Sequence, residues 1–268
     1  MIGAVIGDIA GSRFEFDNYR AKDFEIFTPE SFITDDSIMT LAVAKALLES
    51  GRDYTSLSRN AVKYMREIGC HYPDCGYGAA FLSFIYCPDP EPYNSWGNGA
   101  AMRVSAVPYC ASSIEETKLL SRLVTEVSHN HPEGIKGAEA AAVCGWMALN
   151  GKTKDEIRSY VEDNYYSLDF TIDSIRPTYV FNESSEGTVP QAIEAFLESV
   201  SFEDAVRTAV SVGGDSDTLA AITGGIAEAY YGVPLTMRST VKRWYLDKRL
   251  LSVLNEFEKI YPPKTLPC

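Results

Sequence analysis

Two short acidic clusters, far apart in the chain, each stand directly before a strongly apolar helical pattern. The first is TDDS at residues 34–37, followed by IMTLAVAKALLES, and the second is GGDSDT at residues 213–218, followed by LAAITGGIAEAYYG. Helices this apolar are expected inside a fold, so the carboxylates at their N-terminal ends would lie near its interior. Buried carboxylates that converge lose hydration and repel one another. Divalent cations such as Mg²⁺, Mn²⁺ or Ca²⁺ remove both penalties, so the pattern predicts a two-metal hydrolase site.

Each acidic cluster taken alone has a simpler interpretation as a helix N-cap. One Asp or Thr side chain satisfies free backbone N–H groups and interacts well with the helix dipole. Here each helix start carries two aspartates and additional hydroxyls, more than one cap needs. The metal hypothesis requires the aspartates at 35–36 and 215–217 to share one pocket, within about 10 Å, which is the reach of two bridged metals.

Helical periodicity dominates the rest of the chain, and strand signals are weak. The segment 169–181 alternates only partly and contains Pro177, so it is predicted to be an extended loop or a short edge piece. No Gly/Ser/Pro-rich linker separates two cores, and the two acidic helices must meet. We therefore predict one compact all-α domain over residues 1–268, with helices near 34–50, 55–68, 76–86, 99–111, 114–128, 132–150, 153–164, 189–199, 202–212, 216–231, 236–247 and 249–260.

Composition excludes several classes of function. The formal net charge is −13, and no basic stripe is available to neutralise nucleic-acid phosphates. No apolar run is long enough to span a membrane, and the N-terminal MIGAVIGDIAGS lacks the basic region of a signal peptide. None of the six cysteines forms a CxxC pair, which favours free thiols in a reducing cytoplasm. A soft-metal site at Cys70, His71 and Cys75 lacks an evident fourth ligand.

Three further segments carry candidate chemistry. Glu15 lies between two phenylalanines, where a raised carboxyl pKa would suit a general acid or base, or the residue could bind the metal pair. The alternative is a surface residue or a partner of Arg13 or Arg20. The segment SWGNGAAMR at 95–103 is a glycine-containing loop before a helix, typical of an anion site, and its Trp can stack on a base or ribose. The segment SHNHPEG at 128–134 holds two of the three histidines, whose imidazoles can donate to phosphate or ribose oxygens. Plain capped turns remain the alternative for both loops.

Together these segments resemble the ADP-ribosylglycohydrolase family, to which dinitrogenase-reductase-activating glycohydrolase belongs. The resemblance spans about residues 1–234. It is carried, in order, by GDIAGSRFEF at 7–16, TDDS at 34–37, GNGAAMR at 97–103, SHNHPEGIKGAEAA at 128–141 and GGDSDTLAAITGGIAEAYYG at 213–232. No family motif matches residues 169–188.

The resemblance implies an all-α orthogonal multi-helix bundle with a dinuclear Mg²⁺ or Mn²⁺ centre in a cleft. By motif position, the metal ligands would be Thr34, Asp35, Asp36, Asp215, Asp217 and Thr218. The acidic residue beside the metals would be Glu15. The residues contacting diphosphate, ribose and the rest of the substrate would be Ser95, Trp96, Asn98, Gly99 and His129.

The function implied by the resemblance is hydrolysis of the glycosidic bond at C1″ of an ADP-ribosyl group, attached to a protein side chain or a small conjugate. An oxocarbenium-like transition state is expected, as in other glycoside cleavage. Glu15 is the first candidate for proton transfer and Asp36 the second. The alternative is a non-catalytic ADP-ribose-binding module, which should lack metal-binding carboxylates; all four aspartates are present here.

Overall fold

The computed structural model describes residues 1–266. Within that range the prediction of an all-α fold is confirmed. The helices are α1 (Ile2–Gly11), α2 (Asp35–Ser50), α3 (Leu57–Gly69), α4 (Ala79–Tyr86), the 3₁₀ turn η1 (Asn98–Ala100), α5 (Val107–Cys110), α6 (Ile114–Thr125), α7 (Pro132–Leu149), α8 (Lys154–Asn164), α9 (Ile172–Ile175), α10 (Ser185–Glu198), α11 (Phe202–Val210), α12 (Ser216–Tyr231), α13 (Leu235–Trp244) and α14 (Lys248–Ile260). The two short strands β1 (Val233–Pro234) and β2 (Thr265–Leu266) pair in parallel.

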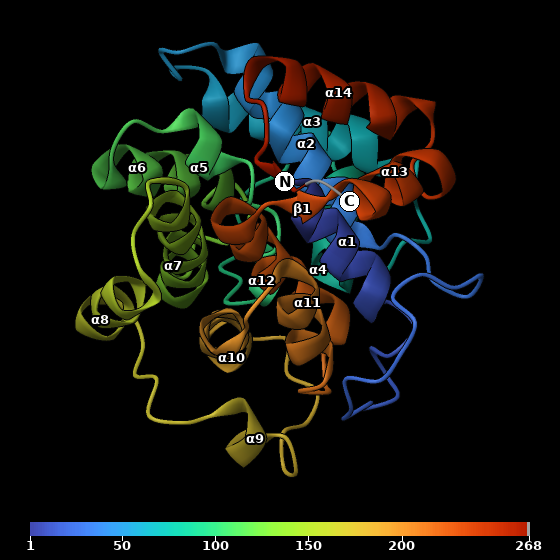
Figure 1. Ribbon diagram of the computed structural model, residues 1–268. Coiled ribbons are helices and arrows are strands. Elements are labelled where there is room, and N and C mark those ends of the chain that lie inside the picture. The colour runs from blue at the N-terminus through green and yellow to red at the C-terminus, as the bar shows by residue number, and fades with distance from the viewer. Residues whose placement is uncertain (267–268) are drawn as a thin grey trace.

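Helices α1 and α12 lie side by side in the middle of the bundle, with the others arranged around them (Figure 1). Every residue of α1 is buried. No helix was predicted over residues 2–11, because Met1 offers no capping side chain and no acidic residue marks the first turn, as Asp215 and Asp217 do at the start of α12. This unpredicted helix carries Asp8 into the interior.

The close approach of α1 to α12 depends on glycine. A Cβ on Gly7 would overlap the carbonyl oxygen of Ala220, and Gly3 and Gly11 face α12 in the same way. These positions recur every four residues, so one face of α1 is bare backbone. The contact brings the N-terminus of α12, with its acidic cluster, next to the end of α1 that leads to Glu15.

Replacing Gly7 by alanine is expected to destabilise the protein by about 3 kcal/mol, since the added methyl group overpacks a backbone contact. Alanine normally stabilises an exposed helix position relative to glycine by about 1 kcal/mol. A loss of stability in Gly7→Ala would therefore indicate the close contact between the helices. Chemical denaturation of Gly7→Ala measures the change. The matched control is Gly78→Ala, where a Cβ meets nothing within 4 Å. Equal stability of both variants would contradict the close helix contact.

Other differences from the sequence-based helices have local causes. The predicted helix 99–111 is interrupted, and only η1 and α5 are helical, with turns between them. Helix α10 begins at Ser185 because Ser184 caps it, and it tolerates Pro190 early in its length. The segment 169–181 was predicted to be an extended loop or a short edge piece. It is a loop that contains the short α9 and a turn after it, at the periphery of the bundle (Figure 1), and no residue in it belongs to a strand.

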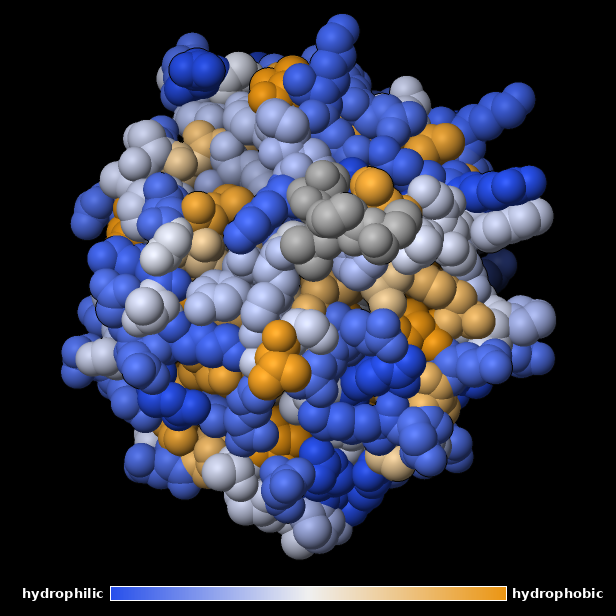
Figure 2. Space-filling model, viewed as in Figure 1, coloured by the Kyte–Doolittle hydropathy of each residue, from blue (hydrophilic) through white to orange (hydrophobic). Residues whose placement is uncertain are grey.

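The helices share a hydrophobic core to which α1, α2, α7, α10 and α12 all contribute buried residues. On the face seen in Figure 2, hydrophobic residues form separate small patches among hydrophilic ones. In the described residues, no helix has the length and apolar character needed to cross a membrane.

Candidate active site

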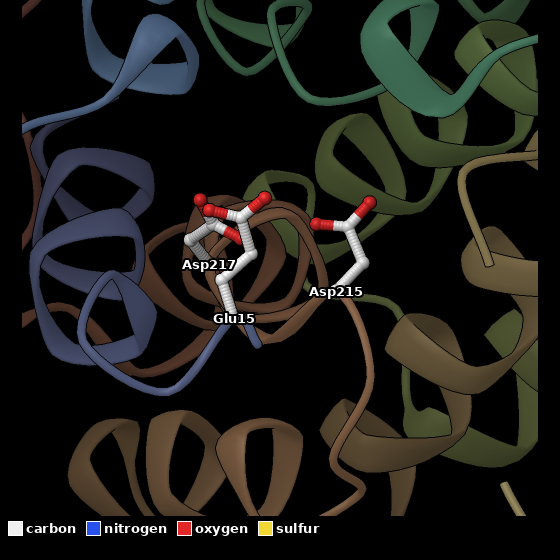
Figure 3. Close-up of side chains that lie close together, drawn as sticks. All are labelled: Glu15, Asp215 and Asp217. Atoms are coloured by element: carbon white, nitrogen blue, oxygen red, sulfur yellow. The ribbon is translucent and has the colours of Figure 1, made fainter. Parts of the chain in front are cut away.

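The two acidic clusters meet at the N-terminal ends of α2 and α12. Thr218 donates a hydrogen bond to Asp36 across this junction, with 3.2 Å between Oγ1 and Oδ2. Glu15, Asp215 and Asp217 each place one carboxylate oxygen within 4.8 Å of the others. Figure 3 shows the three carboxylates close together, one from the loop after α1 and two from the start of α12. Residues as far apart in sequence as Asp36 and Thr218, 182 positions, thus form one cluster.

The cluster lies in a pocket of about 470 Å³. Its acidic side is lined by Glu15, Asp35, Asp36, Asp215, Asp217 and Thr218. The remaining wall includes Gly76, Phe81, Tyr93, Ser95, Trp96, Asn98, Gly99, Met102, Arg103, His129, Phe181 and Glu183. Of the six predicted metal ligands, Thr34 alone does not line the pocket.

Asp8 explains the position of Thr34. Its buried carboxylate accepts hydrogen bonds from the backbone N–H of Thr34 at 3.0 Å, from Thr34 Oγ1 at 2.8 Å and from the backbone N–H and the hydroxyl of Ser37. Thr34 Oγ1 in turn caps α2 by accepting from the N–H of Asp36. Asp8 therefore holds the first turn of α2, and sequence reasoning missed this role although an Asp within an apolar stretch was the available signal.

Burial and mutual repulsion raise the pKa of several carboxyl groups. Burial, with Asp8 and Asp215 nearby, raises the pKa of Asp35 to about 8. The pKa values of Asp36 and Asp217 are raised well above their usual range, mainly by burial and then by neighbouring carboxylates. Asp36 Oδ1 and Asp217 Oδ1 are buried and make no hydrogen bond with any of residues 1–266. Buried carboxylate oxygens without partners are what hard divalent cations bind, so these residues fit such ions.

Glu15 stands at the mouth of the cluster and is half-buried. Burial, followed by the charges of Asp215 and Asp8, raises the pKa of its carboxyl group to about 7. Neither proposed arginine partner pairs with it within residues 1–266: Arg13 donates to the backbone of Glu25, and Arg20 to that of Tyr179. The Glu15 carboxylate is therefore available to the pocket.

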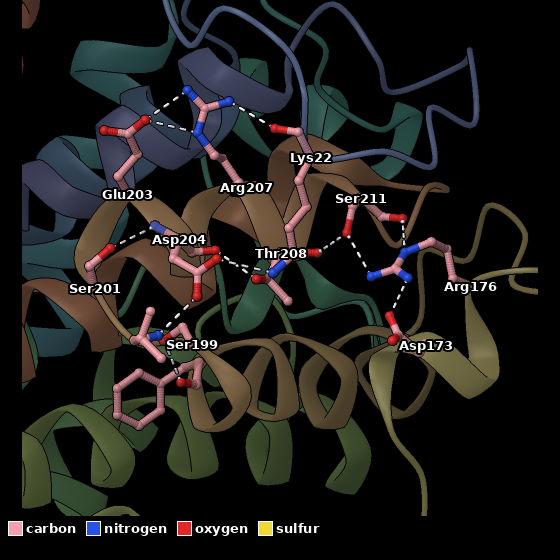
Figure 4. A network of polar contacts seen from close by, with 12 residues as sticks. Lys22, Asp173, Arg176, Ser199, Ser201, Glu203, Asp204, Arg207, Thr208 and Ser211 are labelled. Atoms are coloured by element: carbon pink, nitrogen blue, oxygen red, sulfur yellow. Dashed lines mark hydrogen bonds and ion pairs between the residues drawn. The ribbon is translucent and has the colours of Figure 1, made fainter.

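A polar network holds the two loops that complete the pocket (Figure 4). Arg207 on α11 donates to the carbonyl of Lys22 at 2.8 Å, and Lys22 pairs with Asp204 at 3.0 Å, which anchors the loop after Glu15. Arg176 donates to the carbonyl of Ser211 at 3.0 Å and so anchors the segment that brings Phe181 and Glu183 to the pocket. One loop is thus fixed to α11 and the other to Ser211, the residue that ends α11.

The predicted substrate-contacting residues lie along the other wall. Asn98 is buried and donates to Asp215 Oδ2 at 2.6 Å and to Thr188 at 3.0 Å, so it connects this wall to the acidic cluster. Trp96 lies at the rim with 57% of its surface exposed, whereas His129 is buried. Sequence reasoning missed several other wall residues, among them Phe81, Tyr93, Phe181 and Glu183, which carry no motif.

The sequence model of the ADP-ribosylglycohydrolase family matches residues 1–262. The chain belongs to the ADP-ribosylglycohydrolase family. Human ADP-ribosylhydrolase ARH3 is 26% identical to it, over 87% of this chain and 84% of the relative. ADP-ribosylarginine hydrolase Tri1 of Pseudomonas putida (strain GB-1) is 25% identical, over 87% of this chain and 70% of the relative.

A solved structure named "ADP-ribosylglycohydrolase-related protein complex" has the same fold. It superposes with a TM-score of 0.67, covers 97% of this chain and 95% of its own, and is 21% identical in sequence. Within residues 1–266 of this family member, the one group of His, Cys, Asp or Glu ligand atoms close enough for a metal ion is Glu15, Asp215 and Asp217. The alternative site at Cys70, His71 and Cys75 is not such a group.

Without divalent cations, this family member is expected to lose stability as the pH rises from about 4 to about 8. Burial raises the pKa of Asp8 to about 6, of Glu15 to about 7 and of Asp35 to about 8, all above their ordinary values. The folded state therefore binds more protons than the unfolded state, and its advantage disappears as these groups ionise. Melting temperatures in EDTA at pH 5 to 8 measure the effect.

The same pH series with Mn²⁺ provides the control for this trend. Cations bound by the ionised carboxylates would reverse most of the loss, whereas the general repulsion of an acidic protein would persist. A melting temperature that stays constant or rises with pH in EDTA would contradict the buried like-charge cluster.

Proposed function

We propose that this chain is a hydrolase that cleaves the glycosidic bond at C1″ of an ADP-ribosyl group and depends on two divalent cations, Mg²⁺ or Mn²⁺. Family membership and the named activities of the relatives support the ADP-ribosyl substrate. The observation that carries the proposal is that Glu15, Asp215 and Asp217 place carboxylate oxygens within 4.8 Å of one another in the pocket that Asp36 also lines. Two further carboxylate oxygens there, Asp36 Oδ1 and Asp217 Oδ1, are buried and have no hydrogen-bond partner among residues 1–266.

The proposed metal ligands are Asp35, Asp36, Asp215, Asp217 and Thr218. Thr34 is a sixth candidate, because a hydroxyl that donates its proton to Asp8 keeps a lone pair for a cation. When bound, the cations would supply Lewis acidity and fixed positive charge at the ribose hydroxyls. The carboxylates would then stabilise the positive charge that develops at C1″. Asn98 would orient Asp215 through their 2.6 Å hydrogen bond.

Glu15 is the proposed proton carrier, with Asp36 as the second candidate. A carboxyl group with a pKa near 7 can accept a proton at neutral pH and return it, which suits general acid–base catalysis. In the overall reaction the oxygen of water bonds to C1″ as the bond to the leaving nitrogen or oxygen breaks. Glu15 would take the proton of the water and the leaving atom would receive one.

The rest of the pocket suits the nucleotide portion of the substrate. Trp96 offers an exposed ring face at the rim for stacking, and the turn containing Ser95 and Gly99 exposes polar groups for the diphosphate. We propose an ADP-ribosylated protein or small ADP-ribose conjugate as the partner, and no duplex nucleic acid. The free cysteines among the described residues support a cytoplasmic location as part of the same proposal.

The direct test is to incubate the protein with mono-ADP-ribosylated arginine and serine peptides in Mg²⁺, Mn²⁺ or EDTA. The expected result is release of free ADP-ribose from at least one linkage, in the presence of a cation only. Absence of release from every linkage, with cation binding shown by thermal shift, would overturn the proposal. Binding of ADP-ribose without turnover would instead favour a non-catalytic module.

A further inference from the structure

His129 sits in a closed aromatic corner of the pocket wall. Its imidazole is 5% exposed and packs against the rings of Phe81 and Tyr93, with centroids 6.2 and 5.6 Å away. Its Nδ1 lies 2.9 Å from Ser128 Oγ. Its Nε2 makes no hydrogen bond with any of residues 1–266 and faces Gly99, where an added Cβ would lie 3.2 Å from it.

Arg103 determines which groups donate and which accept the hydrogen bonds around His129. Its guanidinium is fully buried, and Nη2 donates to Ser128 Oγ at 2.8 Å and to the carbonyls of Val124 and Thr125. Arginine only donates hydrogen bonds, so Ser128 Oγ must be the acceptor in this pair. The single proton of Ser128 is then left to find an acceptor of its own.

The Nδ1 atom of His129 is the acceptor available to Ser128. Within residues 1–266 the hydroxyl of Ser128 has no other hydrogen-bond acceptor. If Nδ1 carried a proton, both groups would offer hydrogens to each other and one buried donor would be left unsatisfied. A neutral imidazole whose Nδ1 accepts must carry its proton on Nε2.

The charges around the ring favour the neutral form. Arg103 is the only Lys or Arg that lines the pocket within residues 1–266, and it has no carboxylate partner there. Burial, with the positive charge of Arg103 second, lowers the pKa of His129 well below its usual range. A protonated ring would also leave Ser128 facing two donors.

We propose that Arg103 and Ser128 act as positioning residues that hold His129 as the Nε2–H tautomer, so that the pocket presents a fixed, neutral N–H donor beside Gly99. The recognised chemistry is an oxygen acceptor, namely a ribose or diphosphate oxygen. That ligand rests on the proposed function, whereas the tautomer is a property of the ligand-free protein.

Nitrogen NMR of the ligand-free protein tests the tautomer directly. The chain has only three histidines, so the double variant His71→Gln/His131→Gln isolates the signals of His129. The expected spectrum at pH 7 shows a protonated Nε2 and an unprotonated Nδ1. A protonated Nδ1, or a ring with both nitrogens protonated, would overturn the proposal whether or not the protein is an ADP-ribosyl hydrolase.

Ser128→Ala tests whether the hydroxyl causes this state. The variant is expected to show a mixture of tautomers and to bind ADP-ribose about 3- to 10-fold more weakly by calorimetry, the effect of one hydrogen bond. Ser128→Thr keeps the hydroxyl and is expected to restore both properties. The matched control is Ser121→Ala, which removes another fully buried hydroxyl, one that has no hydrogen-bond partner in the described part of the chain.

Unchanged tautomer and affinity in Ser128→Ala would overturn the positioning role. If Ser128→Ala only lowers stability and leaves the nitrogen spectrum of the folded protein unchanged, the role of Ser128 is merely structural and the positioning role is overturned equally. If the wild-type protein binds no ADP-ribose, the proposed function fails, while the nitrogen spectrum still decides the tautomer.

Discussion

Replacing Asp36 by asparagine is expected to lower the release of ADP-ribose about 1000-fold, because a side chain at the junction of both acidic clusters would no longer bind a cation. One oxygen of Asp36 accepts from Thr218 at 3.2 Å, and the other is buried without a hydrogen-bond partner among residues 1–266. An amide of the same shape keeps the first contact. It presents a neutral group where the cation would need a charge.

The same variant should be more stable than the wild type when no cation is present. The pKa of Asp36 is raised well above its usual range by burial and by Asp35, Asp8 and Asp215, so its ionised form at pH 8 is unfavourable in the folded state. In EDTA at pH 8 we expect a melting temperature about 3–6 °C higher than wild type. We also expect that Mn²⁺, which should raise the melting temperature of the wild type, raises that of the variant much less.

This opposite effect on stability and activity separates metal binding from simple damage to the fold. Asp163→Asn is the matched control, since Asp163 is exposed near the end of α8 and makes no hydrogen bond or ion pair with residues 1–266. The control variant should change neither the rate of ADP-ribose release nor the melting temperature in EDTA. Loss of activity in Asp36→Asn together with lower stability in EDTA would count against the like-charge cluster as the cause.

Replacing Glu15 by glutamine is expected to reduce kcat by at least about 100-fold, the usual contribution of a positioned general acid or base. The amide has the same shape but cannot carry the proton. Binding of ADP-ribose and the thermal stabilisation by Mn²⁺ should both remain. Assays of ADP-ribose release at saturating substrate measure kcat, and calorimetry measures the binding of ADP-ribose separately.

Glu15 has a competing role, because its carboxylate oxygen lies within 4.8 Å of those of Asp215 and Asp217. If Glu15→Gln abolishes the stabilisation by Mn²⁺ along with activity, then Glu15 acts as a metal ligand and the proton carrier must be sought elsewhere. Glu25→Gln controls for removal of a negative charge from the same loop, since the Glu25 side chain is exposed and makes no hydrogen bond or ion pair within residues 1–266. That variant should retain full activity.

Many of the helices could be predicted from local sequence patterns. The helices α2, α6, α7, α11 and α12 were predicted from their apolar helical patterns, and in the structure Ser113 and Ser201 cap α6 and α11. Helix α1 was not predicted: like α12 it is buried on nearly all sides, but no acidic or hydroxyl residue marks its start, since its N-cap is Met1. The break between η1 and α5 likewise depends on packing that sequence spacing does not record.

For the candidate site, the chain itself determined the chemistry, and the tertiary structure decided its arrangement. The acidic clusters at 34–37 and 213–218 predict buried carboxylates because each precedes an apolar helix, which is a local property of the sequence. That Asp8 would hold the first turn of α2, and that Arg103 would orient His129 through Ser128, depends on contacts between segments distant in sequence. Hydrogen bonds and charges act over a few ångströms in space, so only the folded chain decides which donors face which acceptors.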